Sequence, residues 1–146
     1  MRIVPMTAEY AADIATWRYP APYDCYDMTG ADLTDGFYAL VDDRGLIGFR
    51  SFGPDGRVPG GDYDSSALDT GGGLRPELTG QGLGREAIST GLTFGVRQFA
   101  PPAFRMTIAT FNVRAQKVVQ LLGFRAVDHF AASTDGRPYD VFTRPA

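Results

Sequence analysis

Three glycines at every second position lead directly into a stretch with a helical pattern. Gly80, Gly82 and Gly84 stand in LRPELTGQGLGREAI, residues 74–88, and each disfavours a helix by about 1 kcal/mol relative to alanine. They make sense at a helix start if main-chain N–H groups there close around an anion, because glycine admits close approach and tolerates positive φ angles. A bound phosphate is one interpretation, and a tight turn that binds nothing is the other. The glycines alone leave both open.

The hydrophobic pattern around this loop predicts a mixed α/β sheet with helices on its faces. Strands are expected at residues 3–6, 37–42, 46–52, 66–74, 104–110, 124–132 and 139–144. Helices are expected from the Thr7 cap to about residue 17, over 83–99, and over 113–123 after the Asn112 cap. This β-α-β-β-β-α-β-α-β-β order indicates an α/β (α+β) fold.

Length and composition favour one ordinary globular domain over residues 1–146. A single cysteine excludes an internal disulfide and fits a reducing cytoplasm, so a cytoplasmic location is predicted. No apolar run is long enough to span a membrane. The first 74 residues hold twelve acidic residues against five arginines, whereas the remainder holds five against nine basic residues. This asymmetry fits an anion in the second half and a neutral or cationic ligand in the first, although it also fits solvated surface charge. The acidic pI and the scattered basic residues argue against nucleic acid.

Two phosphate-binding fingerprints compete on the glycines. Gly82, Gly84 and Ala87 match the dinucleotide pattern G-x-G-x-x-G/A, but that pattern expects an acid about 20 residues further on. Here no acid follows Glu86 until Asp128. A P-loop would need Gly-Lys-Ser/Thr, and Gly84 is followed by Arg85. An NAD(P)-binding domain therefore stays a distant alternative.

The second fingerprint carries a family resemblance. Residues 79–84, TGQGLG, resemble motif A of the GNAT superfamily of N-acetyltransferases, Q/R-x-x-G-x-G/A. NVRAQKVVQLLGF, residues 112–124, is similar to that family's later signature N-x-R-A-x-x-x-Y-x-x-x-G-F. The two segments cover about a third of the chain, in the family's order and spacing. The resemblance implies a mostly antiparallel sheet of about seven strands, with a splay between strands 4 and 5.

The resemblance also implies acetyl-CoA as cosubstrate and no metal. Its pyrophosphate would rest on the motif A loop, and its pantetheine arm would lie along the fourth strand with Asn112 on the far side. The implied cofactor-binding residues are Gly72, Gly73, Leu74, Gly80, Gln81, Gly82, Leu83, Gly84, Arg85 and Asn112.

Several positions depart from the family pattern. Thr79 replaces the usual Gln or Arg, which should matter little because backbone amides hold the phosphates. Val119 stands where a tyrosine often protonates the leaving thiolate, so water or another tyrosine, such as Tyr139, would have to serve. Thr107 stands at the fifth-strand position of a frequent glutamate base and cannot replace it.

Asp69, near a known base position on the fourth strand, is the candidate catalytic base, and an ordinary strand-end carboxylate is the alternative. His129 is expected to be an ordinary hairpin residue. Cys25 is not expected to act as a nucleophile, because an amine can attack the thioester directly.

The acceptor side is predicted from an aromatic and acidic stretch that contains Trp17, Tyr19, Tyr23 and Tyr26. Aromatic faces beside carboxylates suit a cationic or amphipathic amine, although these rings could instead cap the core. The resulting prediction is an acetyl-CoA-dependent N-acetyltransferase that acts on a primary amine, either a small molecule or a peptide N-terminus or lysine. No nucleic acid or membrane partner is expected, and a homodimer stays open. A catalytically idle CoA-binding sensor or scaffold is the main alternative.

Overall fold

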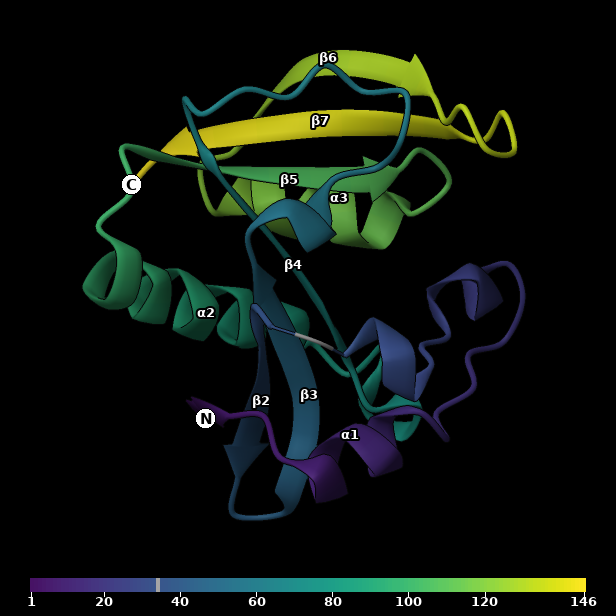
Figure 1. Ribbon diagram of the computed structural model, residues 1–146, viewed down its shortest axis with the longest axis vertical. Coiled ribbons are helices and arrows are strands. Elements are labelled where there is room, and N and C mark those ends of the chain that lie inside the picture. Colours follow the sequence, from purple (N-terminus) through teal and green to yellow (C-terminus); the bar gives the residue numbers. More distant parts are fainter. Residues whose placement is uncertain (34) are drawn as a thin grey trace. The chain divides into compact units, whose positions relative to one another are not determined.

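The protein's structure, a computed structural model, describes residues 1–33 and 35–146. Within them the elements follow the predicted order (Figure 1). The strands are β1 (Arg2–Pro5), β2 (Phe37–Asp42), β3 (Gly45–Phe52), β4 (Leu68–Leu74), β5 (Ala103–Ala109), β6 (Arg125–Ala131) and β7 (Pro138–Pro145). The helices are α1 (Ala8–Ile14), α2 (Gly84–Phe99) and α3 (Val113–Leu121), with short 3-10 helices η1 (Tyr23–Tyr26), η2 (Gly30–Asp32), η3 (Pro54–Gly56) and η4 (Pro76–Leu78).

The seven strands form one sheet in the order β1-β2-β3-β4-β5-β7-β6. β4 pairs with β5 in parallel, with Leu68 opposite Phe104 and Asp69 opposite Arg105. The pairings β1–β2, β5–β7 and β6–β7 are antiparallel. The predicted mixed, mostly antiparallel sheet of seven strands is thus confirmed, while the splay between β4 and β5 stays a prediction.

The described chain groups into two compact units. Unit 1 comprises Met1–Arg50 and Gly72–Gly91, and unit 2 comprises Ser51–Gly71 and Leu92–Ala146. The expectation of one domain over residues 1–146 stays a prediction. Among the described residues, no helix has both the length and the apolar character that crossing a bilayer requires.

Unit 1 has two apolar clusters. One gathers around Phe49 of β3 with Trp17, Ile14 and Phe37, and the other around Leu40, Ile47 and Ala87. Helix α1 starts where Thr7 caps it, with Oγ1 accepting from Tyr10 N. It ends at Ile14, three residues before the predicted end, because Thr16 N and Trp17 N turn back to carbonyls three residues earlier.

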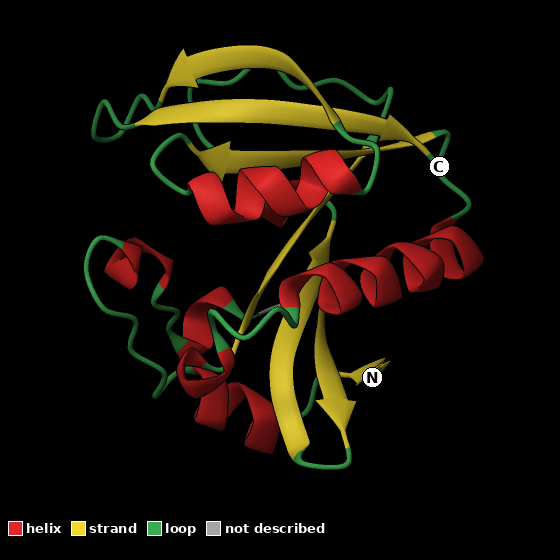
Figure 2. Cartoon of the chain, turned by 180° about the vertical axis from the view of Figure 1, so that it is seen from behind, coloured by secondary structure: helices red, strands yellow, loops and turns green. Residues whose placement is uncertain are grey.

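Unit 2 packs the apolar side chains of β5 and β7 with those of α3 and the second half of α2. Phe104, Phe142 and Val119 are fully buried. Helix α3 runs beside β5 (Figure 2), and Arg144 Nη1 of β7 donates to Leu122 O at the helix end. Asn112 caps α3 as predicted, since its Oδ1 accepts from Ala115 N at 3.2 Å.

The helical spacing of the apolar residues in and just before α2 predicts one buried face, and only part of that face is buried; its members are Leu83, Ala87, Ile88, Leu92, Val96 and Phe99. Ala87, Ile88 and Leu92 are buried, but Val96 is 46% and Phe99 40% exposed. In this last part of the helix a glycine faces the core instead. A Cβ at Gly95 would lie 2.8 Å from the Phe104 ring and 2.9 Å from the Phe52 ring. The rings therefore occupy the space that a longer side chain would need.

Gly95→Ala is expected to destabilise the protein, although alanine is the better helix former. The gain in helix propensity is about 1 kcal/mol, whereas overpacking a core typically costs about 1–3 kcal/mol. We expect a net loss of about 1 kcal/mol in the free energy of unfolding, measured by urea denaturation. Thr93→Ala, at an exposed position of the same helix, is the control. A Gly95→Ala protein more stable than the wild type would contradict this packing.

Candidate cofactor and acceptor sites

The glycines of β4 are required first by the packing of the chain itself. A Cβ at Gly72 would lie 2.2 Å from Phe49 O and 2.8 Å from both Cδ and Nη1 of Arg50. A Cβ at Gly73 would lie 3.1 Å from the Phe49 ring and 3.2 Å from Tyr19 Oη. β3 thus approaches β4 too closely for side chains at these positions. We call Gly72–Leu74 the arm strand, after the pantetheine arm predicted to lie along it.

Arg50 is the charged residue behind this close approach. It is only 4% exposed, and burial lowers its pKa to about 10, so it remains a cation at neutral pH. A Cβ at Gly91 of α2 would lie 3.0 Å from Arg50 Nε. The Arg50 side chain therefore fits where Gly72 and Gly91 leave room for it. The sequence analysis missed this residue, although a charged side chain within the apolar run of β3 was a visible signal.

The phosphate loop, defined as Thr79–Arg85, connects η4 to helix α2. Gly80 and Gly82 have positive φ angles, +74° and +80°, and both are exposed. Thr79 Oγ1 donates to Pro76 O at 2.8 Å, and Gln81 Nε2 donates to Glu77 O at 2.8 Å. These bonds fasten the loop to η4 through side chains, so the backbone N–H groups at the start of α2 are not needed for that purpose.

The helix start has room for a phosphate group. A Cβ placed on Gly82 or Gly84 would meet nothing within 4 Å. The first intrahelical bond runs from Ala87 N to Leu83 O, so the N–H groups just before it are the ones that a helix leaves for external acceptors. Alternating glycines with positive φ angles also form concave N–H arrangements that favour anions. The residues present thus fit a diphosphate.

The four predicted acceptor-pocket aromatics lie in unit 1 but differ in burial. Trp17 is 5% exposed, Tyr19, Tyr23 and Tyr26 are partly buried, and the rings of Tyr23 and Tyr26 lie 6.5 Å apart. Trp17 packs within the core cluster of Phe49, which accounts for its burial. The pocket role of all four stays a prediction.

Trp17 is tied to the end of β4 by Arg75. The Arg75 guanidinium lies 4.8 Å from the Trp17 ring centroid, and its Nη2 donates to Asp13 Oδ2 at 2.7 Å. Trp17 Nε1 donates to Asp13 Oδ1 at 3.0 Å. The hydrogen bond from Arg75 holds the pKa of Asp13 below its usual value. Helix α1 and the segment after it are therefore fixed to the residue that follows the arm strand.

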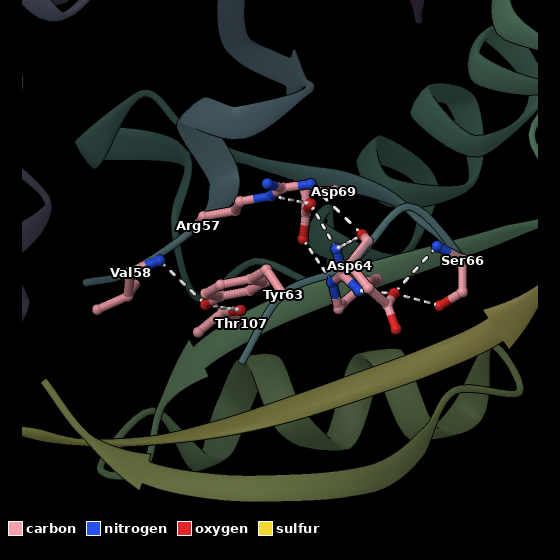
Figure 3. A network of polar contacts seen from close by, with 8 residues as sticks. Arg57, Val58, Tyr63, Asp64, Ser66, Asp69 and Thr107 are labelled. Atoms are coloured by element: carbon pink, nitrogen blue, oxygen red, sulfur yellow. Dashed lines mark hydrogen bonds and ion pairs between the residues drawn. The ribbon is translucent and has the colours of Figure 1, made fainter. Parts of the chain in front are cut away.

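Asp69, the predicted base, lies in a charged network of unit 2 (Figure 3). It is 3% exposed. Its Oδ1 accepts from Arg105 Nε at 2.7 Å, and its Oδ2 accepts from Arg105 Nη2 at 2.8 Å and from Arg57 Nε at 2.9 Å. The pairing with Asp69 raises the pKa of Arg105. Both carboxylate oxygens are thus engaged by guanidinium groups, which is a structural role, and the role as base stays a prediction.

Tyr63 lies beside the two arginines of this network. The guanidinium carbons of Arg57 and Arg105 are 5.6 and 5.0 Å from its ring centroid. Its hydroxyl accepts from Val58 N at 3.0 Å and shares a hydrogen bond of 2.8 Å with Thr107 Oγ1 (Figure 3). Thr107, which stands at the β5 position where the family often has a glutamate, therefore contacts Tyr63 from the loop before β4.

The remaining predicted positions of unit 2 have identifiable contacts. Val119, in the place of the family's tyrosine, is fully buried. His129 lies on β6, and its Nδ1 is 2.7 Å from Asp140 Oδ1, as expected of an ordinary hairpin residue. The Tyr139 ring stacks on Phe130 at 5.9 Å. Cys25 is an exposed cysteine. Over the described part of the chain, no group of three or more His, Cys, Asp or Glu side chains is arranged to hold a metal ion.

Comparison with known proteins gives the family. The model described as "Acetyltransferase (GNAT) domain" matches residues 2–125. The chain belongs to the GNAT acetyltransferase family. The resemblance of residues 79–84 and 112–124 to the GNAT signatures is thereby confirmed. No curated protein sequence matches the chain.

Solved structures show the same fold at low identity. A GNAT-family acetyltransferase from Bacillus anthracis has a TM-score of 0.74 at 12% identity, covering 98% of this chain and 93% of the other. A chimera of the spermidine N-acetyltransferase SpeG from Vibrio cholerae and hSSAT has 0.74 at 13%, covering 98% and 93%. A mutant of the Vibrio cholerae SpeG has 0.70 at 14%, covering 99% and 95%. At these identities the comparison establishes the GNAT fold and not the substrate.

Asp69→Asn is expected to lower the free energy of unfolding by about 3 kcal/mol, because it leaves the buried Arg105 guanidinium without its main counter-charge. Chemical denaturation measures the loss. Asp62→Asn, at an exposed position of the same unit, should change stability by no more than about 0.5 kcal/mol. An Asp69→Asn protein of wild-type stability that has lost acetyl transfer would instead support the role as base.

Proposed function

We propose that this GNAT-family chain is an N-acetyltransferase that uses acetyl-CoA and acts on a primary amine. The observation that carries the proposal is the phosphate loop, where exposed glycines with positive φ angles precede the start of α2 and leave room for a ligand. Gly80, Gln81, Gly82, Leu83, Gly84 and Arg85 would hold the pyrophosphate. Gly72, Gly73 and Leu74 would hold the pantetheine arm, and Asn112 would contact it.

The reaction needs positioning more than it needs a strong acid. The nitrogen of a neutral amine forms a bond to the thioester carbonyl carbon, and the carbon–sulfur bond breaks with its electron pair going to sulfur. The amine also gives up a proton, either to Asp69 or to water. A thiol has a pKa of about 8.5, so its thiolate leaves without obligatory protonation, which is compatible with a valine at position 119. Holding the amine against the thioester would supply most of the acceleration.

The acceptor we favour is a cationic or amphipathic amine, either a small molecule or a peptide N-terminus or lysine. The segment with Tyr19, Tyr23 and Tyr26 combines partly buried rings with the carboxylates of Asp24 and Asp27. Aromatic faces and carboxylates both stabilise an ammonium group. Two of the similar structures are described as spermidine N-acetyltransferases, whose acceptor is an amine of this kind. A cytoplasmic site of action, with no nucleic-acid or membrane partner, remains part of the proposal, and a homodimer remains open.

A CoA-binding sensor without activity is the second candidate. Two observations favour it: Val119 is fully buried and cannot donate a proton, and the Asp69 carboxylate is occupied by two arginines. An NAD(P)-binding domain is now the weakest candidate, because the GNAT family model spans the phosphate loop.

Gly82→Glu is expected to abolish coenzyme A binding without unfolding the protein. The substitution places bulk and negative charge where the diphosphate should lie. No neighbouring atom opposes a Cβ there, and the strain of a side chain at a φ of +80°, about 1–2 kcal/mol, falls on an exposed loop and is too small to unfold the protein. Calorimetric titration measures the affinity, and circular dichroism measures the fold. NADH, added to the wild type, should give neither heat nor a higher melting temperature. Coenzyme A bound equally well by both proteins would contradict the proposed phosphate site.

Acetyl transfer is expected to release free thiol from acetyl-CoA when an amine panel is supplied. Polyamines, aminoglycosides, lysine-containing peptides and peptide N-termini should be included, because the acidic segment favours cationic acceptors. The rate should rise with pH as each amine loses its proton. Tight coenzyme A binding with no thiol release from any member would favour the sensor.

A further inference from the structure

One carbonyl of the arm strand already accepts a hydrogen bond from a side chain. Tyr19 Oη donates to Leu74 O at 2.5 Å. Leu74 ends β4, and in the proposed function its backbone is one of the groups that hold the pantetheine arm. The sequence contained no signal for this contact, because 55 residues separate its two partners.

The Leu74 carbonyl points to the edge of β4 that faces away from β3. Arg75 N donates to Ile47 O of β3 at 2.8 Å. A Cβ on Gly48 of β3 would lie 2.5 Å from Gly73 O, so Gly73 O also faces β3. Successive residues of a strand direct their backbone groups to opposite edges. Leu74, between these two residues, therefore presents its carbonyl at the edge that an added extended chain would use.

The Tyr19 hydroxyl is well held in this position. Tyr19 N donates to Asp27 Oδ1 at 3.0 Å, and the absence of a side chain at Gly73 leaves space for Oη. Burial raises the pKa of Tyr19, with smaller contributions from the charges of Asp27 and Glu77. The hydroxyl therefore stays protonated and remains a donor over the whole physiological range.

We propose that the Tyr19 hydroxyl is an internal competitor of the cofactor arm. It occupies Leu74 O in the free protein and is displaced when an amide N–H of the arm takes that carbonyl. This inference rests on the proposed function and adds a regulatory contact to the same site. It couples two events, because Tyr19 belongs to the segment that is proposed to meet the acceptor.

The coupling has a direction. While Tyr19 is bound to Leu74, residues 19–27 are anchored to β4 through Tyr19 and through the bond from Tyr19 N to Asp27. Displacement by the arm frees the aromatic ring for the acceptor.

Calorimetric titration of the wild type, Tyr19→Phe and Tyr10→Phe with two probes tests the competition. The probes are coenzyme A and 3′-phospho-ADP, which has the diphosphate but no arm. Tyr19→Phe should bind coenzyme A about three- to tenfold more tightly, the value of one neutral hydrogen bond, and 3′-phospho-ADP as the wild type does. Tyr10→Phe removes a hydroxyl from α1 that takes no part in the contact, and it should change neither affinity.

Trp17, the only tryptophan, gives a readout independent of affinity. Its ring lies 4.8 Å from the guanidinium of Arg75, the residue after Leu74, so displacement of Tyr19 should alter its emission. Coenzyme A should change the fluorescence of the wild type and change that of Tyr19→Phe much less.

Three results would overturn the competition. They are unchanged or weaker coenzyme A binding by Tyr19→Phe, equal tightening of both probes, and an identical fluorescence change in both proteins. A wild type that binds no coenzyme A at millimolar concentration would instead refute the proposed function itself, and this inference with it. Thermal unfolding confirms that each variant is folded.

Discussion

The close approach of β3 to β4 in unit 1 is the constraint on which the proposed cofactor site depends. Phe49 O and the buried Arg50 side chain occupy the space beside Gly72, and the Phe49 ring lies beside Gly73. Position 72 must therefore be glycine for reasons internal to the chain, and a side chain at position 73 would be tightly packed. The consequence for a ligand is indirect, because a strand without side chains also has an accessible backbone. The close packing of β3 against β4 thus explains why β4 contains glycines, which are poor strand formers. It also leaves the β4 backbone accessible to the extended ligand of the proposed function.

The buried Arg50 guanidinium costs desolvation free energy, which the favourable interactions of unit 1 must offset. Burying a cation is unfavourable, and its lowered pKa reflects that desolvation. Asp69 and Arg105 of unit 2 solve the equivalent problem by pairing, with two parallel hydrogen bonds between carboxylate and guanidinium. Both oxygens of the Asp69 carboxylate are used in this way. The role of Asp69 as base stays a prediction, with water as the other route for the proton of the amine.

The sequence predicted the element order because each element has a local cause. Asn112 and Thr7 cap the helices they were expected to cap, and the turn at Asp43 and Arg44 joins β2 to β3 at the expected place. The face of α2 was predicted less well, because Gly95 is buried by two rings from distant parts of the sequence. The phosphate loop could be proposed from the sequence because a short motif marks it, and its role stays a prediction. The sequence could not predict the contacts of Asp69 with Arg105 and of Tyr19 with Leu74, because these residues are dozens of positions apart and leave no periodic signal.

The charge asymmetry of the sequence needs a different interpretation once the units are known. By sequence the phosphate loop lies in the basic half, but in the folded chain it belongs to unit 1. Unit 1 holds ten acidic residues and six arginines, whereas unit 2 holds seven acidic and eight basic residues. A net positive field in its own unit therefore cannot be what attracts a diphosphate to this loop. In the proposed function the attraction would come from short-range donors, the N–H groups at the start of α2 together with Arg85, which act over a few ångströms and are little affected by distant carboxylates. In the proposed function, the same excess of acid would favour the other substrate, because a cationic amine would be attracted to the acidic unit that contains the aromatic segment.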